Sequence, residues 1–214
     1  AHTGLPFKEH KVFDLGDGHK LKAQRLWDMA SDAGKKVWIC GSMNAAIQKE
    51  SIHGNILPDP WSTGIKPYPE EEFKPFFNLV QKYVQEYSRD DVPLTKADYV
   101  RFGAFMAKNG LSFKTVLKTL SQLAGEGGGK NKWKRAFILD WLQWDVFRSY
   151  WKKDKPAYAT FFLNSTAHTQ HYYWRNFEPE KFSIKPSAEE QAEFANAIEF
   201  GYRSMDAIVG EVLE

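Results

Sequence analysis

Cysteine is almost missing from this sequence: Cys40 is the single example among 214 residues. One thiol cannot build a disulfide framework within the chain, and it cannot supply the several thiolates of a cysteine zinc cluster. Cys40 lies in the apolar stretch "KKVWICGS", where we expect a small buried side chain rather than a nucleophile. Disulfide-stabilised and cysteine-cluster classes of protein are therefore excluded.

Long apolar runs are missing as well. No stretch approaches the roughly 18 consecutive apolar residues of a membrane-spanning helix. The first residues, "AHTGLPFKEHKVFDLG", lack the charged start and the apolar segment of a secretion signal. We therefore expect no membrane partner and favour a cytoplasmic location.

No charge of either sign dominates the sequence, and its net charge of +2 gives nucleic-acid binding no overall electrostatic support. Aromatic residues are abundant, with 8 Trp, 9 Tyr and 16 Phe, and together with lysines they can form a platform for unpaired bases. Most of them recur at helical spacing, which is typical of a protein core. We expect no nucleic-acid partner, and single-strand binding is an alternative without a recognisable motif.

The clearest secondary-structure pattern joins one helix to one strand. Within residues 21–40, Trp27 and Ala30 share a helical face, Gly34 fits a left-handed helix end, and Val37–Cys40 form a short apolar strand. A helix, a glycine and a strand in this order are typical of the alternating units of an α/β sheet protein.

Residues 42–69 contain four prolines and two glycines, and they are predicted to form a long irregular loop that lines a site. His53 in this loop is a candidate substrate-binding residue, with a solvated loop histidine as the alternative. The helices predicted next are 70–89, 96–110 after a Thr95 cap, 113–125 after a Ser112 cap, and 133–153. In the third of these helices, the residues expected to face inward are Val116, Leu117, Leu120 and Leu123.

A second buried strand is predicted in "AYATFFLN", and a single final helix follows a Ser187 cap. The apolar stripe of that helix comprises Phe194, Ala197, Ile198, Ile208 and Val209. The predicted fold is α/β and helix-rich, with an inserted helical layer or cap. We expect 1–69 to form part of the sheet core with its loop, 70–153 the helical layer, and 154–214 the strand, a histidine loop and the last helix.

The stretch "TFFLNSTAHTQHYYW" places polar residues directly after the second predicted strand. Open α/β sheets hold their sites at the carboxyl ends of strands, so Asn164, His168 and His171 are candidate site residues. On a helix, two histidines at i and i+3 share a face and can bind a borderline metal through imidazole nitrogens. No acidic residue accompanies them, so a crowded surface turn is the alternative. Ser165 and Thr166 are nucleophile candidates, for which a capping role is the alternative.

The stretch "FFLNSTAHTQHYYWRNFEPEKF" resembles the central part of alkaline phosphatase superfamily proteins of the type I phosphodiesterase and nucleotide pyrophosphatase kind. In that family, a buried strand leads to a loop with an Asp, a neighbouring His, and a second His four residues after the Asp. An aromatic-Trp-Arg element follows. The segments "RLWDMASDAGKKVWICGSMN", "IHGNILPDPWSTGIKPYPEE" and "AIEFGYRSMDAIVGEVL" are similar to other parts of the family. The likeness covers most of the chain, and the histidine loop is its specific part.

The resemblance implies a sheet core like that of alkaline phosphatase and the metal-dependent hydrolysis of phosphate esters. Two zinc or manganese ions activate a Ser or Thr nucleophile and stabilise charge on the transferring group. By position, His171 corresponds to the second histidine, and it is the foremost candidate metal ligand. His168 corresponds to the histidine beside the Asp, which in the family is more often a neighbour of the ligands than a ligand, and it is the second candidate. Ala167 stands where the family has Asp, which removes an anionic ligand. Asn164 offers a neutral oxygen at a different spacing, and it is a candidate substrate contact.

The family's other catalytic groups lie outside the matched region. Its nucleophile and first acidic ligand come earlier, its paired Asp-His and final His come later, and no Asp-His dipeptide occurs in the 214 residues. We therefore expect the central portion of a hydrolase of small-molecule phosphate esters, inactive until other parts of the same protein complete it. The alternative is a non-catalytic binding protein that keeps the scaffold, and unpaired sheet edges would favour a homo-oligomer.

Overall fold

Within the residues that the computed structural model describes, 2–14, 17–62, 64–85 and 94–213, the chain is a helix-rich α/β protein. Its strands are β1 (Val37–Cys40), β2 (Gly54–Leu57) and β3 (Tyr158–Phe161). Its α-helices are α1 (Phe7–His10), α2 (Leu26–Asp32), α3 (Glu70–Gln85), α4 (Lys96–Lys108), α5 (Phe113–Ala124), α6 (Arg135–Asp154), α7 (Asn164–Phe177), α8 (Ala188–Phe194) and α9 (Ala197–Leu213). Short 3₁₀ turns lie at Asp17–Lys20, Gly127–Gly129, Lys132–Lys134 and Pro179–Lys181. In these described ranges, no helix is long and apolar enough to cross a membrane.

The chain divides into two compact units. Unit 1 comprises Ala1–Leu111 and Asp145–Phe162, and unit 2 comprises Ser112–Trp144 and Leu163–Glu214. Helix α6 begins in unit 2 and ends in unit 1. The units therefore cut across the three segments expected from the sequence.

In unit 1 the strands form a parallel sheet in the order β2-β1-β3. Cys40, at the end of the central strand, is fully buried and pairs with Leu57 on one side and Phe161 on the other. Gly54 has a φ of +141°, and a Cβ atom there would lie 2.0 Å from the Val37 carbonyl oxygen. Strand β2 can therefore approach β1 this closely only with glycine at that position.

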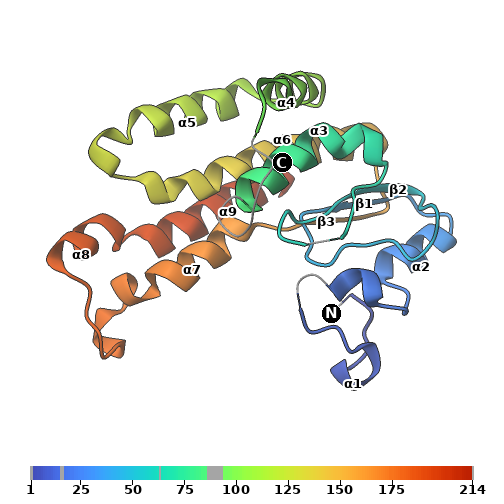
Figure 1. Ribbon diagram of the computed structural model, residues 1–214, viewed down its shortest axis with the longest axis horizontal. Coiled ribbons are helices and arrows are strands. Elements are labelled where there is room, and N and C mark those ends of the chain that lie inside the picture. Colours follow the sequence, from blue (N-terminus) through green and yellow to red (C-terminus); the bar gives the residue numbers. More distant parts are fainter. Residues whose placement is uncertain (1, 15–16, 63, 86–93, 214) are drawn as a thin grey trace. The chain divides into compact units, whose positions relative to one another are not determined.

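Both faces of the sheet are covered by helices, as is usual for parallel sheets. On one face, Trp27 of α2 packs in a cluster with Ile39. On the other, Trp38 stacks against Phe73 of α3 and Phe147 of α6, with ring centroids 5.5 and 5.8 Å apart. Figure 1 shows α2 and α3 on opposite sides of the strands. The helix–glycine–strand pattern at 21–40 is thus confirmed.

Two expectations about the sheet are wrong. The predicted irregular loop 42–69 contains β2, and Ile56 of that strand also exchanges two backbone hydrogen bonds of 2.8 Å with Tyr68. The predicted second buried strand is β3, which is only partly buried, with Ala159 exposed, because it lies at an edge of the sheet. Strand β2 was missed because its pairing with β1, and not a local pattern, fixes it.

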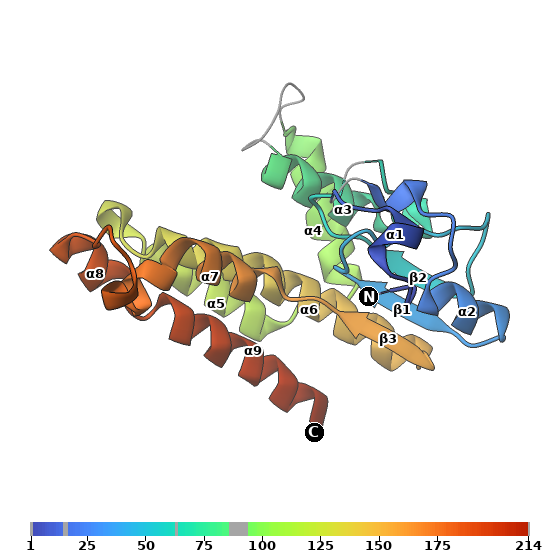
Figure 2. The ribbon, with the colours of Figure 1, turned by 90° about the horizontal axis from the view of Figure 1, so that it is seen from below.

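Unit 2 is built around α7 and α9, which lie side by side in Figures 1 and 2. Its buried centre contains Trp133 and Phe137, and the Phe137 ring meets Phe200 edge-on with centroids 4.8 Å apart. Ser187 caps α8 as predicted, accepting the Glu190 N–H at 3.1 Å. The predicted single final helix is instead two helices, α8 and α9, separated by a turn at 195–196.

Helix α5 has the predicted start, since the Ser112 hydroxyl accepts an N–H of its first turn. The prediction that it buries its leucines is wrong. Leu117, Leu120 and Leu123 are 50%, 59% and 47% exposed, whereas Thr115 is buried. Apolar periodicity locates the apolar face of a helix, but it does not show that another element covers that face.

Candidate functional site

The predicted histidine loop is a helix. Helix α7 begins at Asn164, three residues after the end of β3, so the carboxyl end of a parallel strand leads directly into it. Asn164, His168 and His171 occupy positions i, i+4 and i+7, which lie along one helical face. The structure therefore brings three of the four predicted site residues onto one stripe.

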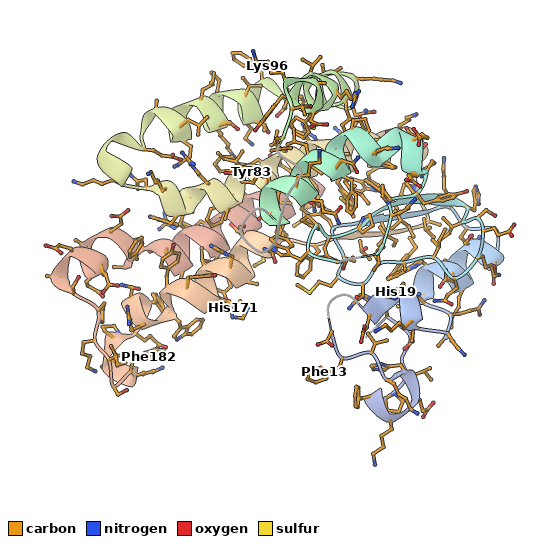
Figure 3. The ribbon with its side chains drawn as sticks, in the orientation of Figure 1. Phe13, His19, Tyr83, Lys96, His171 and Phe182 are labelled. Atoms are coloured by element: carbon orange, nitrogen blue, oxygen red, sulfur yellow. The ribbon has the colours of Figure 1, made fainter. Side chains whose placement is uncertain are left out.

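The two histidines differ in their surroundings. His171 is exposed, and Figure 3 shows its side chain projecting from α7. His168 is half-buried, and its ring centroid lies 4.5 Å from that of Tyr172. Burial, and next the charge of His171, lower the pKa of His168. A lowered pKa keeps the imidazole neutral, which is the form that binds metal ions.

Two imidazoles fill only part of a metal coordination shell. Zinc sites use three or four protein ligands. In the described part of the chain, no three His, Cys, Asp or Glu side chains are grouped so that they could hold a metal ion. Ala167, half-buried one turn before His171, supplies no ligand atom. His168 and His171 can thus fill two coordination positions of a zinc or manganese ion, and the remaining positions need ligands from beyond the described residues.

Asp140 of α6 is a residue of this site that the sequence did not reveal. Its carboxylate is 4% exposed and accepts the Ser165 hydroxyl, the Ser165 N–H at 3.3 Å, and the Asn164 N–H. Burial raises the pKa of Asp140 to about 7, although these hydrogen bonds oppose the shift. One indication of it was present in the sequence: Asp140 lies on the same helical face as the apolar residues Phe137 and Trp144, where a carboxylate is unexpected.

Ser165 is a structural residue rather than an accessible nucleophile. Its side chain is buried, and its hydroxyl donates to Asp140. The hydroxyl does not cap α7 either, since it donates to a carboxylate of α6 and accepts no N–H within the described residues of its own helix. Thr169, one turn later, is also buried and donates its hydroxyl to the Thr166 carbonyl oxygen at 2.9 Å. These residues hold the inner side of α7 against its unit.

His53 lies at the amino end of β2, which begins at the next residue. Its side chain is exposed, and its backbone N–H donates to the Ser31 hydroxyl at 2.8 Å. The loops that carry sites in parallel sheets lie at the carboxyl ends of the strands. His53 therefore lies at the opposite, amino end of the strands, with the exposure of a solvated loop histidine.

The carboxyl edge of the sheet in unit 1 holds its own polar groups. Ser42 follows β1, and its hydroxyl lies 3.0 Å from that of Thr160 on β3. Asp59 follows β2 and accepts the Trp61 and Ser62 N–H groups at 3.0 and 2.9 Å. Burial raises the pKa of Asp59, opposed by these bonds. The Ser42–Thr160 bond and the bonds of Asp59 thus hold the segments that follow β1 and β2.

The arrangement on α7 permits one kind of chemistry. Two imidazoles on adjacent turns can hold one divalent cation, and the Asn164 amide on the same stripe can donate to an anion bound to that cation. No protein-family model, curated protein or solved structure matches this chain.

Proposed function

We propose that this chain supplies sheet core and metal ligands to a metal-dependent phosphoester hydrolase of the alkaline phosphatase type. One observation carries the proposal: a parallel strand, β3, leads at its carboxyl end into a helix that presents Asn164, His168 and His171 on one face. The parallel sheet of unit 1, covered by helices on both faces, also supports the sheet-core part of the proposal.

In this proposal His168 and His171 bind zinc or manganese through neutral imidazole nitrogens. A metal held by these residues would supply Lewis-acid chemistry, polarising a phosphate oxygen and stabilising charge on the transferring group. Asn164, at the start of the same stripe, donates its side-chain N–H groups to a phosphate oxygen of a small-molecule ester. The remaining ligands and the nucleophile come from outside the described residues, so this chain by itself does not hydrolyse esters.

Metal and phosphate titrations test the proposal. We expect calorimetry to show one zinc ion bound per chain, and inorganic phosphate to bind only once zinc is present. His168→Ala and His171→Ala should each weaken zinc binding by about tenfold or more, which equals about 1.4 kcal/mol. His53→Ala is the matched control, an exposed histidine outside α7. Zinc binding that survives both α7 substitutions, or zinc-loaded protein that ignores phosphate, would overturn the proposal.

A second candidate function, non-catalytic binding, is favoured by the orientation of α5. Its apolar residues Phe113, Leu117 and Leu120 are exposed to solvent. Its polar side meets unit 2, where the ammonium group of Lys118 lies 5.0 Å from the centre of the Trp141 ring. An amphipathic helix with its apolar stripe outward is typical of an interaction surface.

The occupant that this stripe fits best is a second copy of the same chain. The stripe contains no charged residue, so it offers nothing to attract a charged partner. In an antiparallel pair of α5 helices, Leu117 would face Leu120, and the large Phe113 would face the small Ala124. Two copies would cover on the order of 1,000 Å² in total, near the lower limit for a specific interface.

A further inference from the structure

Helix α7 has no cap from its own sequence. The residue before it, Leu163, makes no side-chain capping hydrogen bond, because an aliphatic side chain has no acceptor. The first backbone N–H groups of a helix have no partner within the helix, and leaving them unpaired in a buried place costs stability. Another part of the chain must therefore supply the acceptor.

Asp140 of α6 supplies it. The carboxylate takes up the backbone N–H groups of Asn164 and Ser165, together with the Ser165 hydroxyl. Its own position is set by the buried residues Phe137 and Trp144, which lie nearly one turn before and one turn after it on α6. A buried carboxylate on a packed helix thus fixes the place where α7 begins.

The stripe formed by Asn164, His168 and His171 starts at this end of α7. Asn164 is the first residue of α7, His168 follows one turn later, and His171 nearly another. The i+3 spacing brings the two imidazoles to one cation only while residues 168–171 stay helical. His168 directly follows the first turn, and its N–H pairs with the Asn164 carbonyl in the helical pattern, so fraying of residues 164–167 loosens both Asn164 and His168. The metal would then have to order them when it binds.

We propose that Asp140 is a positioning residue for the metal-binding stripe of α7, holding Asn164 and His168 in register with His171. This inference rests on the function proposed above. Asp140 touches neither metal nor substrate in this role. It acts through the first turn of α7, as outer-shell carboxylates act through the ligands that they orient.

The test uses the whole chain and compares Asp140→Ala with the conservative Asp140→Asn. Amide hydrogen exchange in residues 164–168 should be roughly fivefold to thirtyfold faster in Asp140→Ala. Zinc affinity should fall by about tenfold, measured under conditions where the variant is fully folded. Asp140→Asn keeps an acceptor oxygen and should recover most of both losses.

Phe73→Leu is the control for a general loss of stability, because Phe73 packs on Trp38 in unit 1, whereas Asp140 and α7 belong to unit 2. It should lower the unfolding temperature without changing the zinc affinity of the folded protein. If Asp140→Ala leaves exchange at 164–168 or zinc affinity unchanged, the inference is overturned. If the wild-type chain binds no zinc, the proposed function fails. In that case, faster amide exchange at 164–168 in Asp140→Ala would show that Asp140 only caps α7. Its role in positioning metal ligands would then fail together with the proposed metal-binding function.

Discussion

Gly201 of α9 lies so close to Thr169 of α7 that a methyl group on Gly201 would come within 2.8 Å of the Thr169 hydroxyl oxygen. Thr169 is fully buried and its hydroxyl already donates to the Thr166 carbonyl. The close approach of α7 and α9 therefore depends on the missing side chain. In this way α9 presses the inner side of α7 into place while the histidines remain on another side.

Gly201→Ala should lower the free energy of unfolding by about 1–3 kcal/mol, because the added methyl group must push α7 and α9 apart. Gly210→Ala, in the same helix with open space around it, should raise the free energy of unfolding by up to about 1 kcal/mol. Urea unfolding followed by circular dichroism measures both. Equal effects of the two substitutions would mean that α7 and α9 do not approach this closely.

Asp140 should make the protein more stable as the pH falls through neutrality. The pKa of Asp140 is about 7 in the folded chain and near 4 in the unfolded chain, so only the folded chain takes up this proton between those values. The contribution is greatest at the acid end of that window and is lost as pH rises through 7. Its slope should be at most about 1.4 kcal/mol per pH unit.

The contribution of Asp140 to the pH dependence is obtained by comparing the unfolding free energy of wild type with that of Asp140→Asn, which has no titrating group at this position. When unfolding free energies are measured at several values between pH 5 and pH 8, the value for wild type minus the value for Asp140→Asn should increase as the pH is lowered. Parallel curves would show that Asp140 keeps an ordinary pKa in the folded protein.

Ala167→Asp should strengthen zinc binding by about tenfold or more, because it adds an anionic oxygen one turn before His171. Ala167→Asn, of similar size but neutral, is the control and should give a smaller gain. Calorimetry with zinc measures both affinities. If Ala167→Asp binds zinc no better than wild type, the His171 imidazole is not directed at a metal site.

Leu120→Glu should abolish self-association through α5, because a buried carboxylate at the centre of the pair has no partner. Light scattering after size exclusion should show dimers of wild type at about 100 μM and monomers of the variant. Val100→Glu, at a more exposed apolar position on α4, should leave the dimer intact. A wild-type chain that stays monomeric at that concentration excludes a second copy as the partner of α5.

The parts of the fold that depend on neighbouring residues were predictable from the sequence. Thr95, Ser112 and Ser187 mark helix starts because their hydroxyls bond to N–H groups within three residues. The apolar run Val37–Cys40 likewise identifies β1. In each case the residues that indicate the element belong to it or lie next to it in the sequence.

The parts that depend on distant residues were not predictable in the same way. Strand β2 is four residues long and is followed directly by Pro58, so its pairing with β1 decides its conformation. Asp140 and Ser165 are 25 positions apart, and nothing in either local sequence announces their bond. For α5 the helix itself followed from its periodicity, while the side that it turns outward depends on α6 and α9, which pack on its polar side.

The single thiol of the sequence lies in the central strand of a sheet covered on both faces, and burial raises the pKa of Cys40 well above its ordinary value. An alkylating reagent needs an exposed thiolate, so Cys40 should resist modification as long as β1 stays paired. The rate at which the native chain is alkylated therefore reports how often unit 1 opens. The opening rate of unit 1 can thus be measured on the native thiol, without an introduced label.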